Sequence, residues 1–250
     1  MKKPLAAVLA TAALLAAASV HAAEIRVLAS NGVKAALEEL APAFERETGH
    51  RLALEFGVAN VLKRKIDEGG AFDLAILTNA NIDDLSRSGK VDGASRAGIA
   101  RSGVGIGVRK GARHPDISSP EALKRTVLAA KSISWAKEGA SGQYFAGLVD
   151  RMGIGEETRK KAVLAANGVE VGKLVGEGKA ELAALLVNEI IAAPGMDLVG
   201  PLPAALQTYL VFDGGVASAS PSADAAKALI AFLKRPAAKA VFTAKGQEPA

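Results

Sequence analysis

The residues that could do chemistry in this sequence are small, neutral hydrogen-bonding side chains in five segments: 30–32, 57–60, 78–79, 138–142 and 188. Each segment follows a predicted strand, and four of the five precede a predicted helix. A helix N-terminus carries unpaired N–H groups and the positive end of the helix dipole, so it can bind an anion. Ser, Asn and Thr also cap helices, and capping alone would explain any one segment.

If the five segments converge, they form a candidate site for a small anion. The residues predicted to bind it are Asn31, Gly32, Ala59, Asn60, Thr78, Ser141, Gly142, Tyr144 and Asn188. Glu138 and Tyr144 are titratable and lie beside the fourth segment; a solvated loop charge and a packed helix residue are the alternatives. Arg101, Arg109 and Lys110 could hold carboxylates near a predicted crossover, with a solvated surface role as the alternative.

The residue types argue against thiolate, metal, Ser-His-Asp and dinucleotide sites. The chain has no cysteine, which excludes thiolate catalysis and cysteine-ligated zinc. No Ser-His-Asp arrangement or metal-ligand cluster is recognisable, and we expect neither a metal nor a cofactor. His50 and His114 fall in polar turns, where surface residues are expected. No helix directly follows the glycine-rich residues 103–108, which argues against a dinucleotide loop.

Composition places the chain among globular proteins. It has 250 residues, of which 50% are hydrophobic and 23% are charged, and this excludes intrinsic disorder. The formal net charge of +5 is mild and scattered, unlike the clustered basic face of a nucleic-acid binder. The length allows one domain or two small ones.

The first 22 residues predict a cleaved signal peptide. Lys2 and Lys3 begin it, an apolar run from residue 5 to 18 follows, and residues 20–22 resemble a small-residue cleavage site. The apolar run is short for a membrane span, although an N-terminal anchor is the alternative. We therefore expect a bacterial periplasmic protein that is not embedded in the membrane.

Strand and helix patterns alternate along the rest of the chain. Residues 24–90 predict a βαβαβα unit with strands at 24–28, 51–56 and 72–77. A helix follows each strand: the first ends at 48–49, the second ends at 69–70, and the third is capped by Asn81 or Asp83. The middle of the sequence predicts a helix from Pro120, a strand at 132–135, and a loop at 139–142 that opens a helix. A helix at 156–163, a short helix and turn at 168–178, and a strand at 180–187 follow. Strand 209–212 then returns, and helices start at Ser222 or Asp224 and at Pro236.

This order predicts an α/β protein of two lobes, each a mostly parallel sheet flanked by helices. We expect lobe 1 at residues 23–103 and 205–250 and lobe 2 at 104–204. Two crossover strands would join the lobes and serve as a hinge, with ligand bound in the cleft between them.

Several ordered segments carry a family resemblance. They are A-P-A-F-E-R-E-T-G at 41–49, F-G at 56–57, F-D-L-A-I at 72–76, G-Q-Y at 142–144, G-E-G-K-A at 176–180 and the stretch 225–236. Together they resemble the periplasmic molybdate-binding proteins and their relatives among the type 2 solute-binding proteins of ABC transporters. The resemblance covers essentially the whole mature chain and implies a two-lobed, periplasmic-binding-protein type 2 fold that closes over a small anion.

The resemblance also implies where the ligand lies and what it is. Hydroxyl side chains of the molybdate binders align with Gly32, Ala59 and Leu186, which carry none. The ligand is therefore either a molybdate-type oxyanion or an organic carboxylate, the latter more in keeping with these residues. An ABC-transporter permease is the implied partner and a monomer the implied state. An aconitate isomerase is similar to this family, so a tricarboxylate isomerase, with Glu138 and Tyr144 moving the proton, is the alternative.

Overall fold

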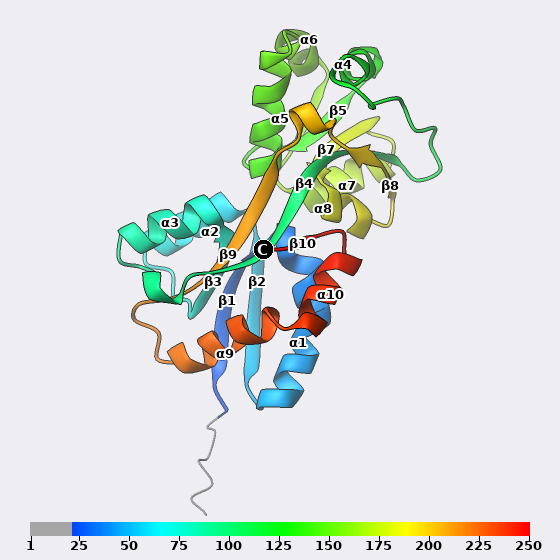
Figure 1. Cartoon of the computed structure of the whole chain (residues 1–250). Helices are drawn as coiled ribbons and strands as arrows, with labels where there is room; N and C mark the ends of the chain where they lie inside the picture. The colour runs from blue at the N-terminus through cyan, green and yellow to red at the C-terminus, as the bar shows by residue number, and fades with distance from the viewer. Residues whose placement is uncertain (1–21) are drawn as a thin grey trace, which may run out of the picture.

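The computed structural model describes residues 22–250. Two groups of helices and strands, joined by long strands, make up the molecule (Figure 1). The predicted signal peptide lies outside the described residues except for Ala22. Within residues 22–250, no helix combines the length and apolar character needed to cross a membrane.

The first group is built on three parallel strands. They are β1 (Glu24–Ser30), β2 (Arg51–Gly57) and β3 (Leu74–Thr78), and β1 lies between the other two. Helices α1 (Lys34–Thr48), α2 (Ala59–Asp67) and α3 (Asn79–Arg87) follow the strands in turn, so the predicted βαβαβα order is confirmed. Gly49, in the left-handed conformation at φ 74°, ends α1 as its C-cap.

The second group repeats this arrangement. Its parallel strands are β5 (Ile133–Ala136), β6 (Ala162–Ala165) and β7 (Leu182–Leu186), with β5 in the middle. Its helices are α4 (Pro120–Ala129), α5 (Ala140–Arg151), α6 (Gly155–Lys160), α7 (Gly168–Gly176) and α8 (Val187–Ala192). Ser119 caps α4 and Pro120 opens it, as the sequence predicts.

Two strands run from one group to the other. They are β4 (Ala97–Arg109) and β9 (Tyr209–Val216), which pair antiparallel with each other. β9 also pairs with β3, and β4 with β7, so the sheet continues through both groups. The chain ends on the first group with α9 (Ala223–Leu233), α10 (Pro236–Ala244) and the short β10 (Glu248–Pro249).

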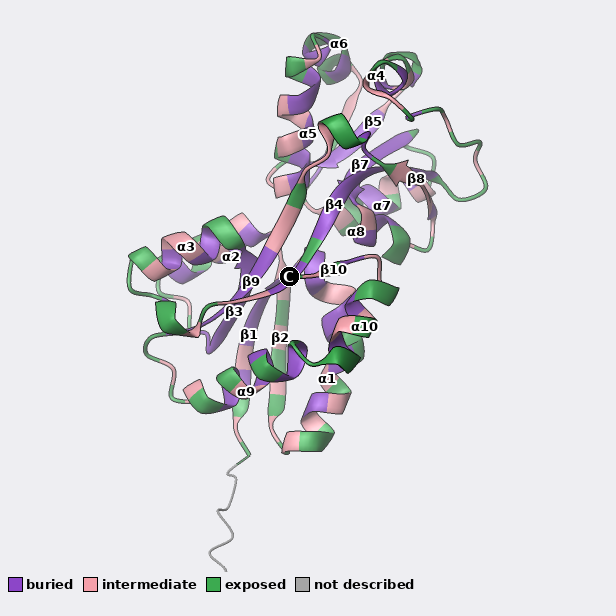
Figure 2. Ribbon diagram, in the orientation of Figure 1, coloured by how far each residue is buried: buried purple, intermediate pink, exposed green. Residues whose placement is uncertain are grey.

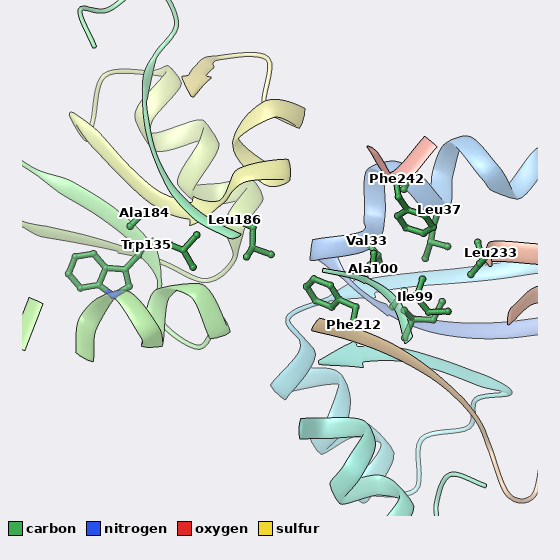
Figure 3. Packing of buried hydrophobic residues seen from close by; sticks show 14 of the residues in the cluster. Val33, Leu37, Ile99, Ala100, Trp135, Ala184, Leu186, Phe212, Leu233 and Phe242 are labelled. Atoms are coloured by element: carbon green, nitrogen blue, oxygen red, sulfur yellow. The ribbon is translucent and has the colours of Figure 1, made fainter. Parts of the chain in front are cut away.

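Strands β3 and β7 lie in the buried interior of the two groups. All five residues of β3 and of β7 are buried, as expected for strands covered on both faces. The outer faces of α2 and α3 are exposed (Figure 2). The labelled residues of the largest buried cluster fall into two groups, one with Trp135, Ala184 and Leu186 and one with Val33 and Phe212 (Figure 3).

Several predicted elements are wrong. Residues 162–163 belong to β6, not to a helix at 156–163, and α3 begins at Asn79 rather than at Asn81 or Asp83. Ser141 and Gly142 lie in the first turn of α5 rather than in a loop before it. The sequence patterns also missed α8 and β8 (Met196–Pro201), a strand paired with β4.

Candidate functional site

A small cavity lies between the two groups of elements. Its volume is about 40 Å³, and we call it the inner cavity. Residues 30–32, 57–59, 78, 210 and 212 line it from one side, and residues 136, 139–141, 168, 186 and 189 from the other. Four of the five predicted segments contribute to this wall, so the expected convergence of these four is confirmed.

Three helices begin at the inner cavity without a side-chain cap. Ala59 is the first residue of α2, Thr78 is the N-cap of α3, and Ala140 and Ser141 open α5. At none of these three N-termini does the side chain of the N-cap residue accept a hydrogen bond, although Asn79, the first residue of α3, accepts one from the Ala80 N–H at 2.9 Å. Their N–H groups and dipoles are therefore left to favour negative charge in the space they face.

Helices α4 and α7 show the contrast, because their N-caps are filled from within the chain. Ser119 accepts a hydrogen bond from the Ala122 N–H, and Asn167 accepts one from the Glu170 N–H. Ser30 likewise accepts from the Gly32 N–H, at 3.2 Å, before the 3₁₀ turn Asn31–Val33. The alternative interpretation of the segments as simple caps thus fits Ser30 in the first segment, and Asn79 in the third also accepts a hydrogen bond from a helix N–H.

The structure brings together five of the nine predicted ligand-binding residues. Asn31, Gly32, Ala59, Thr78 and Ser141 line the inner cavity. Two of the positions that the family resemblance aligned with hydroxyl side chains, Gly32 and Ala59, are in this set, and the third, Leu186, lines the cavity as well. A Cβ built on Gly32 would lie 2.3 Å from the Phe212 ring, so glycine is required for this packing.

Asn60 and Glu138 instead connect the two sides of the cleft. The Asn60 amide donates to the Glu138 carbonyl at 3.3 Å and accepts from the Asn81 amide at 3.1 Å. The Arg64 guanidinium pairs with the Glu138 carboxylate at 2.6 Å. We call these four residues the clasp, and they lie outside the lining of the inner cavity.

Asn188 makes a second contact between the two sides. Its amide donates to the Gly32 carbonyl at 2.8 Å, and the Gln247 amide donates to the same oxygen at 3.0 Å. Both amide oxygens are buried without a partner among residues 22–250. Asn188 lines a different hollow, described below, and not the inner cavity.

The last two predicted residues have packing roles. The Tyr144 hydroxyl donates to the Leu206 carbonyl at 2.5 Å, and its ring lies under the Arg151 guanidinium. A Cβ on Gly142 would lie 2.1 Å from the Ala136 carbonyl oxygen, so glycine permits the close approach of α5 to β5. Neither residue lines the inner cavity.

A wider hollow opens beside the inner cavity. It has a volume of about 560 Å³ and shares Asn31, Gly168 and Glu189 with the inner cavity, and we call it the outer groove. Residues of α1, α7, α8 and the turn 193–195 line it, several of them small. Its charged residues are Lys34, Glu38, Lys173, Glu177 and Glu189.

Glu189 is a cavity residue that the sequence patterns missed. It lies in the first turn of α8 and is only partly exposed. Among the described residues that line the inner cavity, Glu189 alone is titratable. Burial raises the pKa of the Glu189 carboxyl to about 7, and a hydrogen bond from the Leu186 amide acts in the opposite direction.

The remaining candidate groups lie elsewhere. Arg101 pairs with Glu248 at 2.8 Å, and His114, Arg109 and Lys110 are exposed. Trp135 is buried beside Phe145, as expected for a core residue. Within residues 22–250, no group of three or more His, Cys, Asp or Glu side chains is placed to hold a metal ion.

This chain is similar to known proteins over nearly its whole length. Residues 25–248 match the family model described as bacterial extracellular solute-binding protein. An aconitate isomerase from Pseudomonas sp is 32% identical over 243 residues, which cover 94% of this chain and 91% of that protein. The molybdate-binding protein ModA of Azotobacter vinelandii is 26% identical over 247 residues, which cover 96% and 95%.

Solved structures share the fold at lower identity. The periplasmic molybdate-binding protein of Azotobacter vinelandii superposes with a TM-score of 0.77 at 18% identity, covering 90% of this chain and 99% of that chain. The sulfate-binding protein SubI of Mycobacterium tuberculosis gives 0.75 at 18% identity, covering 91% and 87%. Both are two-sided α/β proteins of the arrangement described above, the periplasmic-binding-protein type 2 fold. With nearly every residue from β1 to β10 matched in order, this chain belongs to the bacterial extracellular solute-binding proteins.

Proposed function

We propose that this protein binds a small organic anion with carboxylate groups in the cleft between its lobes. The observation that carries the proposal is the inner cavity, onto which three helices open with uncapped N-termini. A carboxylate there would accept hydrogen bonds from backbone N–H groups and from Ser141. Binding would need no metal and no lysine or arginine in the inner cavity.

The shape of the cleft supports a carbon skeleton over a compact oxyanion. Gly32, Ala59 and Leu186 present no hydroxyl group to the inner cavity. The outer groove adjoins the inner cavity at Asn31, Gly168 and Glu189, so a ligand can extend from one into the other. A second carboxylate at the groove would compete with Glu38 for Lys34 and with Glu177 for Lys173.

Delivery to an ABC-transporter permease in the periplasm completes the proposed role. Residues 1–22 would be removed as a signal peptide, and the mature chain would act as a diffusing monomer. The lobes, residues 23–103 with 205–250 and residues 104–204, would close about β4 and β9. The clasp and the Asn188–Gly32 contact join the two sides and would favour the closed form.

A thermal-shift panel on residues 23–250 tests the proposal. It compares molybdate, tungstate, sulfate and phosphate with citrate, cis-aconitate and trans-aconitate. Saturation at a hundred times Kd adds about 2.7 kcal/mol to the free energy of unfolding and raises Tm by a few degrees. We expect shifts with the tricarboxylates. A shift with molybdate or tungstate alone would overturn the organic ligand and leave an oxyanion carrier.

The second candidate is an isomerase of an unsaturated tricarboxylate on the same scaffold. The full-length match to an aconitate isomerase favours it, together with a titratable carboxyl, Glu189, on the cavity wall. The proton-moving pair inferred from the sequence, Glu138 and Tyr144, is engaged elsewhere by Arg64 and the Leu206 carbonyl. Conversion of trans-aconitate to cis-aconitate, followed by proton NMR, separates the candidates: turnover favours the isomerase, and binding without product favours the carrier.

A further inference from the structure

Glu189 is a carboxyl group without a charged partner at the junction of the inner cavity and the outer groove. Its carboxyl makes no ion pair and no hydrogen bond with a side chain within residues 22–250. The residue is partly exposed and lines both hollows, so it borders the cleft. A ligand that extends from the cavity into the groove would lie beside Asn31, Gly168 and Glu189, the residues that line both.

The other carboxylates around the cleft are already neutralised. Glu38 pairs with Lys34 on α1, Glu177 pairs with Lys179 at 2.7 Å, and Glu138 pairs with Arg64. Lys173, on α7, lies 4.0 Å from Glu177. Lys34, Glu38, Lys173 and Glu177 are the other charged residues that line the outer groove, and none of them forms an ion pair with Glu189 in the described part of the chain.

The packing around Glu189 leaves room for its carboxyl at the junction. A Cβ built on Gly168 would lie 2.8 Å from Oε1 and 3.1 Å from Oε2 of Glu189. Glycine at this first position of α7 therefore lets the carboxyl lie against the helix backbone. Replacement of Gly168 by any larger residue would displace the carboxyl from the cavity wall.

We propose that Glu189 is the catalytic acid–base group of an allylic proton shift on an unsaturated polycarboxylate bound across the inner cavity and outer groove. This inference rests on the second candidate function. The Glu189 carboxylate removes a proton from the CH₂ carbon beside the double bond. The electron pair moves through the allyl system, the double bond shifts by one position, and the same carboxyl returns the proton to the far carbon. Atoms and electrons balance without a co-reactant.

Two features of the site match this chemistry. A pKa of about 7 leaves both forms of the Glu189 carboxyl populated near neutral pH, which is what a group that takes and returns a proton requires. The uncapped helices α2, α3 and α5 face the space where a substrate carboxylate would gain negative charge as the carbon loses its proton.

The test uses the mature chain in D₂O with cis-aconitate or trans-aconitate, followed by NMR. We expect the wild type to incorporate solvent deuterium at the carbons of the allyl system and to isomerise the substrate. Glu189→Gln should lower the exchange rate at least ~100-fold and keep the ligand-induced thermal shift. Glu156→Gln is the matched control, because Glu156 is exposed on α6 and pairs only with Lys160.

Each outcome decides between the proposals. Binding of the tricarboxylates with neither deuterium exchange nor isomerisation in the wild type would overturn the role of Glu189 and leave the binding function intact. Absence of binding would overturn both the organic ligand and the isomerase. Exchange by Glu189→Gln at the wild-type rate would show that another group moves the proton.

Discussion

At the residue scale, Glu189 links the site to the stability of the fold. Burial raises the pKa of its carboxyl from 4.5 to about 7. The native state then holds a proton that the unfolded state releases between these pH values. Stability must therefore fall as pH rises through this window, by about 3 kcal/mol in total. Below pH 4.5 both states are protonated and the penalty vanishes.

Glu189→Gln removes this titration. We expect the variant to be more stable than wild type by about 2–3 kcal/mol at pH 8 and equal to it near pH 4. Urea unfolding at a series of pH values measures the difference. Glu156→Gln, on an exposed side chain, should stay within about 0.5 kcal/mol of wild type throughout. Parallel pH profiles for wild type and Glu189→Gln would contradict the raised pKa.

Ser141 is the side-chain hydroxyl in α5 that we expect to contact the ligand. It is 4% exposed and lines the inner cavity. Ser141→Ala should weaken binding by about 1.5–3 kcal/mol, the range for a hydrogen bond to a charged group. Isothermal titration with the ligand found in the thermal-shift panel measures this loss. Ser134→Ala is the control, because Ser134 is buried in β5 and donates to the Val163 carbonyl; equal affinities of both variants would exclude Ser141 from the site.

Residue types alone predicted some of the residues that line the inner cavity. They did not predict which polar side chains form hydrogen bonds to another element instead. Asn31, Thr78 and Ser141 were found because small polar residues after strands mark helix N-termini. Asn60 and Asn188 have the same residue type and position, but their amides bond to carbonyls across the cleft. Nothing local in a sequence distinguishes these cases, and the buried environment of Glu189 depends on α7 and α8 together.

At the element scale, Asp73 ties three segments of the first lobe together. Its carboxylate accepts from the Arg26 N–H at 2.8 Å, from the Arg26 guanidinium at 3.0 Å and from the Ser220 hydroxyl at 2.8 Å. Burial acts to raise the pKa of Asp73, but these bonds outweigh burial and hold the pKa below its usual value. The ion pair thus connects β1, the residue before β3 and the segment before α9.

Asp73→Asn should lower the free energy of unfolding by about 1.5–3 kcal/mol, because the buried side chain loses its charge-assisted hydrogen bonds while the partly exposed Arg26 guanidinium stays solvated. In the wild type, this contribution is present above the unfolded-state pKa and is lost as pH falls through the lower native pKa. Urea unfolding at pH 7 measures the change, with Asp67→Asn, on an exposed pair with Lys63, as the control. Equal stability of the two variants would contradict this role of Asp73.

Helices and strands were predicted correctly where the apolar spacing extends over many residues, and incorrectly where an apolar run is short. The patterns over residues 24–90 gave the correct order because α1 shows several turns of apolar spacing and a glycine follows each helix within two residues. β6 has four residues, and α8 has six, which is too few for a period to distinguish helix from strand. β8 carries Gly200 and Pro201, which read as a turn.

At the scale of the whole molecule, the order of elements was sufficient to predict two α/β units joined by two strands, and the residue segments that resemble a known family were needed to predict the family. A chain that leaves one α/β unit, builds a second and returns must cross between them twice, and β4 and β9 are those crossings. The boundaries at residues 103–104 and 204–205 stay a prediction, since β4 runs through the first of them without a break. The closing motion about these strands is open to a direct kinetic test.

The clasp gives that test. Arg64 and Glu138 form an exposed pair, so Arg64→Ala should cost only about 0.2–1 kcal/mol of affinity, and Asn60→Ala about 1 kcal/mol more. Because the clasp forms only when the lobes meet, the loss should appear as faster ligand dissociation with little change in association.

Stopped-flow fluorescence of Trp135, on the second-lobe strand β5, follows both steps. Lys63→Ala is the matched control on the same helix, since Lys63 pairs only with Asp67. A double variant with unchanged dissociation would mean that these contacts do not hold the closed form.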